Sequence, residues 1–143
     1  MTVPVNDTCP VGRAANVVGD RWSLLIVRDV MDGLHRFGDL QRNLGVARNI
    51  LTDRLKRLVD AGVLATEPVE GGSAYQQYVL TPKGAQLFPL IVALRQWGEQ
   101  HLFTAGEPHS VLIDTATGEV IAPMQATNRQ GEVLQASGTA VQR

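Results

Sequence analysis

The sequence contains only one cysteine, Cys9, among its 143 residues. A single thiol cannot form a disulfide within the chain, which excludes the small secreted domains that depend on disulfides and is typical of a reducing compartment. The N-terminus also lacks a basic region followed by an apolar core, so we expect no signal peptide. We therefore expect a cytoplasmic protein.

Long apolar runs are lacking as well. The most apolar stretch, residues 24–27, is far too short to span a bilayer, which needs about 20 apolar residues. We expect no membrane partner. The overall composition, with 44% hydrophobic and 19% charged residues, is ordinary for a globular chain, and the length suits one domain with a small appendage.

Motifs for catalysis and for metal binding are absent. The three histidines, His35, His101 and His109, do not have the spacing of metal ligands. Gly71-Gly72 is followed by no helix and is therefore not a phosphate-binding loop. No Ser-His-acid arrangement stands out by its spacing. We predict a protein that is not an enzyme, with no catalytic residues, no metal and no cofactor.

The net charge of −1 conceals an asymmetry between the two parts of the chain. Residues 1–59 hold nine Lys and Arg against six Asp and Glu, whereas residues 60–143 hold four against eight. A basic first part suggests a polyanionic partner, although an ordinary solvated surface gives the same pattern.

Helix signals fill the first part of the chain. Pro10 is typical of a first helical position, Gly19 of a helix end, and Asp20 of an N-cap. Gly45 predicts a tight turn between two helices, the second of which has an apolar stripe that includes Leu51. This pair has the pattern of a helix-turn-helix. The spacing predicts helices over residues 10–18, 21–32, 38–44 and 47–61.

A β-hairpin is predicted directly after the fourth helix. Residues 63–67 and 74–80 have strand character, and Gly71-Gly72 is the turn between them. One long helix is expected over residues 82–103, with a kink at Pro89. Three helices, a hairpin and a further helix make a winged helix-turn-helix, so the predicted fold is α+β and mainly helical.

The C-terminal segment has a different character. Short apolar runs around Thr117-Gly118 and a second turn predict a small β-meander over residues 111–134, and we expect a mobile end after Ala136. The predicted organisation is a winged helix-turn-helix domain for DNA binding and dimerisation over residues 1–105. A small C-terminal β extension follows over residues 106–143.

Several separate motifs occur in order between residues 8 and 103, namely Cys9-Pro10, GDRW at 19–22, Arg36-Phe37, the helix of residues 51–58, Ala61-Gly62, YVLTPKG at 78–84 and Trp97-Gly98. With these motifs, residues 8–103 resemble the HxlR-type transcriptional regulators of bacteria, which are related to the MarR group. The resemblance implies a DNA-binding homodimer that represses or activates nearby genes. Some members sense quinones, aldehydes or oxidants through an N-terminal cysteine, which Cys9 matches.

The fourth helix is the predicted recognition helix. Opposite the stripe centred on Leu51, helical geometry places Asn49, Asp53, Lys56 and Asp60. On such a face an Asn side chain can pair with adenine and an Arg side chain with guanine in the major groove. The alternative interpretation is an ordinary amphipathic helix on the protein surface. The predicted DNA-binding residues are Arg36, Arg42, Arg48, Asn49, Thr52, Lys56 and Arg57.

The predicted wing departs from the usual basic composition. Residues 63–80 contain Glu67 and Glu70 but no Arg or Lys. A wing without positive charges binds DNA phosphates weakly, so we expect the affinity for DNA to depend on the recognition helix with Arg36 and Arg42. We also expect this affinity to fall only modestly with added salt.

Two questions stay open at this stage. The long helix carries more apolar surface than one domain needs, which predicts a dimer interface, although the same side chains also suit the core of one domain. Cys9 is either a reactive thiol or a small structural residue at a helix start. The alternatives to a thiol-sensing regulator are control by a non-covalent small ligand and a protein-interaction module that binds no DNA. The predicted interface residues are Leu87, Leu90, Ile91, Leu94 and Trp97.

Overall fold

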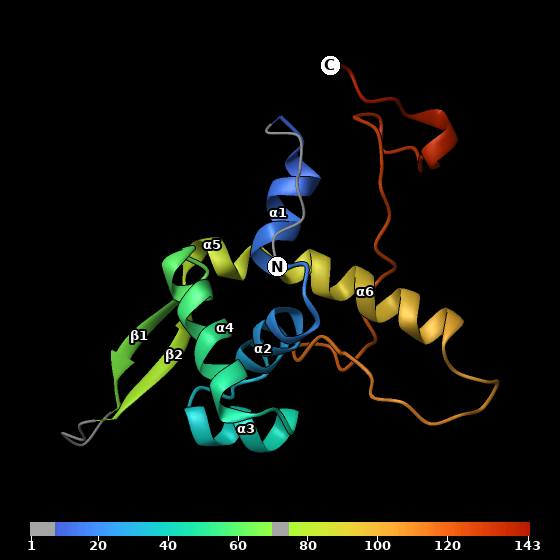
Figure 1. Ribbon diagram of the computed structural model, residues 1–143. Coiled ribbons are helices and arrows are strands. Elements are labelled where there is room, and N and C mark those ends of the chain that lie inside the picture. Colours follow the sequence, from blue (N-terminus) through green and yellow to red (C-terminus); the bar gives the residue numbers. More distant parts are fainter. Residues whose placement is uncertain (1–7, 70–74) are drawn as a thin grey trace. The chain divides into compact units, whose positions relative to one another are not determined.

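The computed structural model describes residues 8–69 and 75–143 (Figure 1). The chain forms two compact units, Met1–Ile91 and Val92–Arg143. Most of the regular structure is helical and the sheet has two antiparallel strands, which confirms the predicted fold class. The elements are α1 (Pro10–Val18), α2 (Arg21–Met31), α3 (Phe37–Leu44), α4 (Arg48–Asp60), β1 (Leu64–Pro68), β2 (Gln76–Leu80), α5 (Pro82–Ala85), α6 (Phe88–His101) and the 3-10 turn η1 (Ala136–Gly138).

The first two helices begin where the sequence predicts. Cys9 is the N-cap of α1, and its Sγ accepts a hydrogen bond from the backbone N–H of Gly12 at 3.3 Å. Asp20 is the N-cap of α2, and its Oδ2 accepts from the N–H of Ser23 at 3.0 Å. Removing such a cap costs about 0.5–2 kcal/mol of stability.

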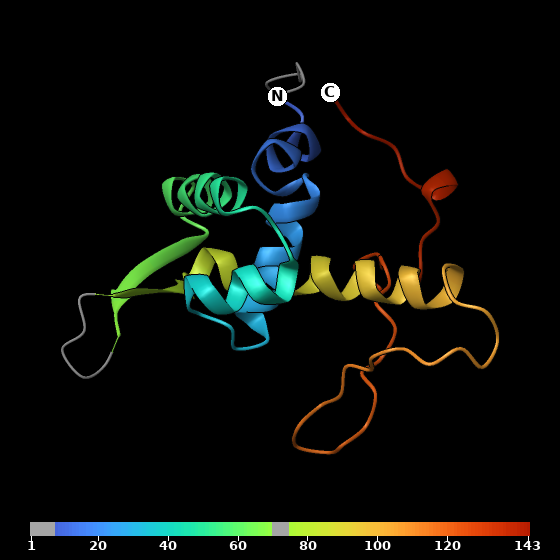
Figure 2. The same ribbon diagram turned by 60° about the horizontal axis from the view of Figure 1, so that its bottom comes forward.

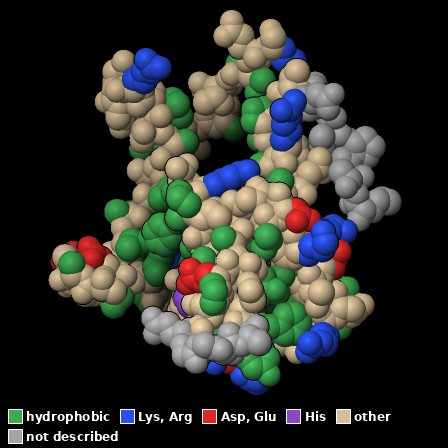
Figure 3. All heavy atoms as spheres, turned by 90° about the vertical axis from the view of Figure 1, so that its left-hand side faces the viewer, with side chains coloured by type: hydrophobic (Ala, Val, Ile, Leu, Met, Phe, Trp, Pro, Cys, Tyr) green, Lys and Arg blue, Asp and Glu red, His purple; other side chains and the backbone are tan. Residues whose placement is uncertain are grey.

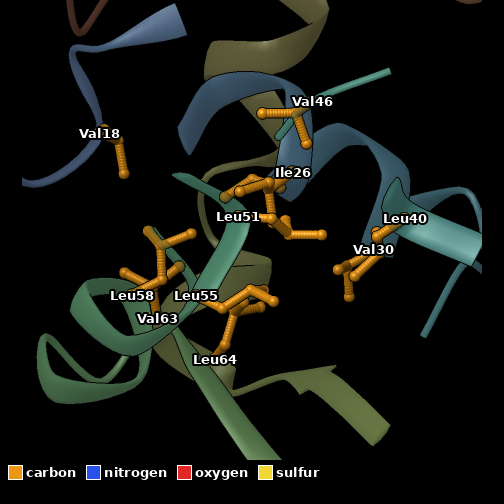
Figure 4. Close-up of a cluster of buried hydrophobic side chains, with 11 residues drawn as sticks. Val18, Ile26, Val30, Leu40, Val46, Leu51, Leu55, Leu58, Val63 and Leu64 are labelled. Carbon is orange, nitrogen blue, oxygen red and sulfur yellow. The ribbon is translucent and has the colours of Figure 1, made fainter. Parts of the chain in front are cut away.

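The core of the first unit lies between α2, α3 and α4 (Figure 4). Leu51, Leu55 and Leu58 of α4, Ile26 of α2 and Leu40 of α3 belong to one buried cluster, in which Leu51 lies beside Ile26. All five side chains are at most 1% exposed. Burying a side chain of this size contributes about 1.5–3 kcal/mol, so the predicted apolar stripe of α4 is what orients the helix.

The two strands extend away from the helices of this unit (Figures 1 and 2). Leu64 pairs with Leu80 and Pro68 with Gln76 in an antiparallel ladder, close to the predicted hairpin. The predicted turn at Gly71-Gly72 lies outside the described residues.

The base of the wing is fastened to the end of α4. Thr81 Oγ1 donates to the backbone carbonyls of Gly62 and Val63, and Lys83 Nζ donates to the carbonyl of Ala61 at 2.8 Å. A Cβ at Gly84 would lie 2.0 Å from the carbonyl oxygen of Val63, so only glycine permits this approach.

The predicted single helix over residues 82–103 is wrong. The chain forms a four-residue α5, turns at Gln86 and Leu87, and starts α6 at Phe88. Pro89 therefore lies in the first turn of α6, where its missing N–H has no helical partner to lose, and produces no kink inside a helix. The break leaves α5 on the wing base and makes α6 a separate helix.

The predicted β-meander is reduced to two isolated bridges. Ile113 pairs with Val120 and Thr127 with Val133, and no strand follows β2 within the described residues 75–143. The side chain of Gln96 makes backbone hydrogen bonds here that a neighbouring strand would otherwise make. It donates to the carbonyl of Ala122 at 3.0 Å and accepts from the N–H of Met124 at 2.7 Å. Backbone groups satisfied in this way need no neighbouring strand.

Candidate nucleic-acid interface

The turn between α3 and α4 is built on Gly45. Its φ of 64° lies in the left-handed region, which glycine adopts without the clash of a Cβ. Its N–H donates to the carbonyl of Gln41 at 2.9 Å, and the Gln41 side chain donates to the carbonyl of Val46 at 3.4 Å. These bonds fix where α4 starts relative to α3, as a helix-turn-helix requires.

The outer face of α4 carries an open hollow lined only by side chains of that helix. The structure brings together four of the predicted DNA-binding residues here and adds Asp53. Thr52 Oγ1 donates to the carbonyl of Arg48 at 2.9 Å, so its oxygen remains available as an acceptor. The lining residues are Arg48, Asn49, Thr52, Asp53 and Lys56.

Acidic neighbours pair with the basic side chains in the second half of α4. Lys56 Nζ lies 2.8 Å from Asp60 Oδ2, and this hydrogen bond raises the pKa of Lys56. Arg57 Nε lies 3.0 Å from Asp53 Oδ2. Figure 3 shows basic side chains that stand apart from one another, with acidic ones beside several of them. Exposed pairs of this kind are weak, so both cations are able to exchange their partners for a phosphate.

A second hollow, of about 470 Å³, lies between the starts of α3 and α4 and strand β2. The Arg48 guanidinium stands 4.8 Å above the ring centroid of Phe37, and Arg36 is the N-cap residue of α3. The positive end of a helix and nearby guanidinium groups favour an anion such as a phosphate. Arg42 also lines this hollow, where it pairs with Asp39.

A buried carboxylate that the sequence analysis missed holds α3 on α2. Asp29 is 1% exposed. Its Oδ1 accepts from Nε and Nη2 of Arg28 at 2.9 and 2.7 Å, and its Oδ2 accepts from Nδ2 of Asn43 at 2.8 Å. Because both oxygens have donors, the buried charge is tolerated.

A second contact, also missed, joins the start of α2 to α4. Asp20 Oδ2 accepts from Arg54 Nε at 3.1 Å in addition to its cap bond from Ser23. Burial opposes ionisation of Asp20, but the hydrogen bonds from Ser23 and Arg54 outweigh it and lower the pKa of this carboxyl. The hydrogen bond that Arg54 donates to Asp20 in turn raises the pKa of Arg54. Neither contact has a signal in local spacing, since each joins two different helices.

The HxlR-like helix-turn-helix family matches residues 17–105, a range that includes α2 to α6 and both strands. The chain belongs to the HxlR family. HxlR-family proteins are transcriptional regulators with a winged helix-turn-helix of the MarR-like kind and are not enzymes.

Relatives of this HxlR-family chain support the same conclusion. The HTH-type transcriptional regulator Rv3095 of Mycobacterium tuberculosis is 40% identical over 126 residues, which cover 88% of this chain and 80% of the relative. The protein PA1607, known from a crystal structure, is 47% identical in sequence. The match covers 96% of each chain, with a TM-score of 0.91. The redox regulator HypR in its reduced form is 26% identical in sequence. The match covers 66% of this chain and 94% of the HypR chain, with a TM-score of 0.60.

The predicted interface residues of this HxlR-family chain divide into two groups. Leu87 and Ile91 pack against the core of the first unit. Leu90, Leu94 and Trp97 lie on another face of the same segment, where they are 41%, 46% and 59% exposed. The first pair therefore holds the chain to its own core, and the second group remains as an apolar surface.

The predicted redox residue, Cys9, is a free and half-buried thiol at the start of α1. Its Sγ accepts a hydrogen bond from the N–H of Gly12, so the sulfur lies at the N-terminal end of the helix. Arg13 lies one turn further along the same helix.

Within residues 8–69 and 75–143, no group of three His, Cys, Asp or Glu side chains is arranged to hold a metal ion. In the same part of the chain, no helix is long and apolar enough to cross a membrane. His35 instead serves the wing, where its Nδ1 lies 2.9 Å from the carbonyl of Tyr78.

Proposed function

We propose that this regulator binds specific DNA sequences as a homodimer, with α4 of each copy in a major groove. The observation that carries the proposal is the outer face of α4, where Arg48, Asn49 and Thr52 are exposed within its first turns while the opposite face is buried. Residues at this end of a recognition helix contact base edges, and a bidentate pair gives about 1–3 kcal/mol of discrimination. Its site of action is the cytoplasm, where the bacterial chromosome lies.

The second hollow suits a phosphate of the DNA backbone. Arg36 and Arg42 line it beside the start of α3, and Lys56 and Arg57 supply further cations along α4. Each neutralised phosphate adds about −0.9 to the slope of log affinity against log salt. With no Lys or Arg in residues 63–80, we expect the modest slope of a protein that contacts few phosphates.

Mobility shifts with DNA from upstream of the protein's own gene test this proposal. We expect Arg48→Ala to weaken binding about fivefold or more, because one base contact is lost. Arg129→Ala removes the same charge from an exposed position in the C-terminal unit and should leave the affinity unchanged. Equal binding by all three proteins would contradict the proposed role of α4. Absence of binding by the unaltered protein would favour the protein-interaction alternative.

The exposed apolar face of α6 is the proposed dimer contact. Leu90, Leu94 and Trp97 recur at intervals of four and three residues, which aligns them along one side of the helix. A two-fold axis on this face would let two recognition helices meet a palindromic operator. The position of that operator relative to the promoter would decide between repression and activation, both of which the family resemblance allows.

Cys9 is the proposed sensor of electrophiles or oxidants. Its free and partly exposed thiol at the start of α1 supports this role, and so does the similarity of the chain to HypR, a redox regulator. The chain has no second cysteine. The reactions open to Cys9 are a disulfide with the other copy, a mixed disulfide with a small thiol, and an adduct.

A non-covalent effector is the second candidate, and it has one observation in its favour. An open hollow of about 510 Å³ in the C-terminal unit is lined by Trp97 and Met124 beside the amide groups of Gln96, Gln100 and Gln125. Apolar walls with a few polar groups are typical of small-molecule sites.

A further inference from the structure

An acidic residue lies in the middle of the proposed DNA-reading face. Asp53 lines the same hollow as Arg48, Asn49 and Thr52, and 46% of its side chain is exposed. A carboxylate on this face would lie close to the phosphates of bound DNA, which repel it. A carboxylate at the centre of this face would be compatible with bound DNA if a DNA group donated a hydrogen bond to it.

The surroundings of Asp53 hold its carboxylate in place and leave one oxygen available. Oδ2 accepts from Arg54 Nη1 at 2.7 Å and pairs with Arg57 Nε at 3.0 Å. Arg54 is itself held by Asp20, so this side of the carboxylate is anchored to the first unit. Among the described residues, no hydrogen bond or ion pair of Asp53 involves Oδ1.

We propose that Asp53 is a specificity-determining residue that accepts a hydrogen bond from the N4 amino group of a cytosine in each half-site. This inference rests on the proposed function. Guanine and thymine present only acceptors at the corresponding major-groove edge and would repel the carboxylate. Adenine presents its N6 donor beside the N7 acceptor, whereas cytosine presents a donor alone. The Arg54 guanidinium on Oδ2, which Asp20 also holds, offsets the repulsion from the DNA backbone when Arg57 contacts a phosphate.

Asp60 is the matched control for Asp53, because among the described residues its carboxylate pairs only within α4. It pairs with Lys56 at 2.8 Å, is 62% exposed and stands at the last residue of α4, outside the hollow that Asp53 lines. Replacing either carboxylate by an amide removes one negative charge from the same helix. Only a base contact makes the two substitutions differ in sequence preference.

The test is selection of binding sites by the full chain from duplexes with a randomised 20-base-pair core. We expect the unaltered protein to prefer cytosine about tenfold at one position of each half-site. Asp53→Asn should change that preference to adenine, since Asn pairs with N6 and N7 of adenine, and Asp53→Ala should abolish the preference. Asp60→Asn should raise the affinity for all sequences and keep the selected motif.

The outcomes separate this inference from the proposed function. If the unaltered protein selects no motif, sequence-specific DNA binding itself is overturned. If it selects a motif that Asp53→Asn and Asp53→Ala leave unchanged, the role of Asp53 is overturned while DNA binding stands. A motif altered equally by Asp53→Asn and Asp60→Asn would reduce Asp53 to a general electrostatic effect. Circular dichroism of each variant checks that α4 remains folded.

Discussion

The side-chain amide of Asn43 in α3 donates a 2.8 Å hydrogen bond to the buried carboxylate of Asp29 in α2. We expect Asp29→Ala to lower the free energy of unfolding by about 1–3 kcal/mol, because the Asn43 and Arg28 bonds are lost together. Urea denaturation followed by circular dichroism measures the change.

Asp39→Ala is the matched control for this measurement. Its carboxylate pairs with Arg42 on the surface of α3, and 44% of the side chain is exposed. A surface ion pair contributes at most about 1 kcal/mol, so the control should lose clearly less stability than Asp29→Ala. Equal losses from both substitutions would show that the buried contact does not hold α3 in place.

The contact between Asp20 and Arg54 predicts a dependence of stability on pH. The pKa of Asp20 is lowered in the folded protein, so the contribution is complete above the unfolded value of about 3.9 and is lost as the pH falls through the folded value. Asp20→Asn keeps an N-cap but removes the charge. We expect the unaltered protein to melt at a higher temperature than this variant at pH 7, and the difference to shrink below about pH 4. A difference that is unchanged at pH 2 would sink this interpretation.

Substitution on the exposed face of α6 tests the proposed dimer. Leu94→Glu should weaken association about tenfold or more, because an unpaired charge is costly to bury. Sedimentation at micromolar concentrations reports the oligomeric state. Val141→Glu places the same charge at an exposed position near the C-terminus and should have no effect. A monomer in the unaltered protein would refute the dimer.

The sensing role of Cys9 has a direct test. Serine is a good N-cap, so Cys9→Ser should preserve α1 and bind DNA as the unaltered protein does. The variant should lose any change in DNA binding that diamide or a quinone causes, since no other thiol is present. Mobility shifts with and without each reagent measure the response, and mass spectrometry identifies the product. A response that persists in the variant would make Cys9 a structural residue.

Local signals predicted much of the first unit. Pro10 and Asp20 specify helix starts through groups within three residues of each other, and Gly45 specifies a left-handed turn by its own backbone. The leucines of α4 follow a period that only one buried face satisfies. These features depend on neighbours in the sequence, so they can be recognised before any packing is known.

Features that depend on residues far apart in the sequence could not be predicted from local patterns. Asp29 and Asn43 are 14 residues apart and meet only because α2 and α3 pack together. Gln96 satisfies backbone groups 26 and 28 residues further on, which removed the predicted meander. Pro89 suits either a kink or a helix start, and the approach of Gly84 to Val63 favours a separate α5 on the wing base.

The bonds from Thr81 and Lys83 to the end of α4 have a mechanical consequence. They bind the last turn of α4 to α5, while Leu87 and Ile91 attach the following segment to the same core. The angle between α4 and the wing is therefore set before any DNA is bound. Both elements would meet DNA in the arrangement that they already have, with no need for either of them to refold.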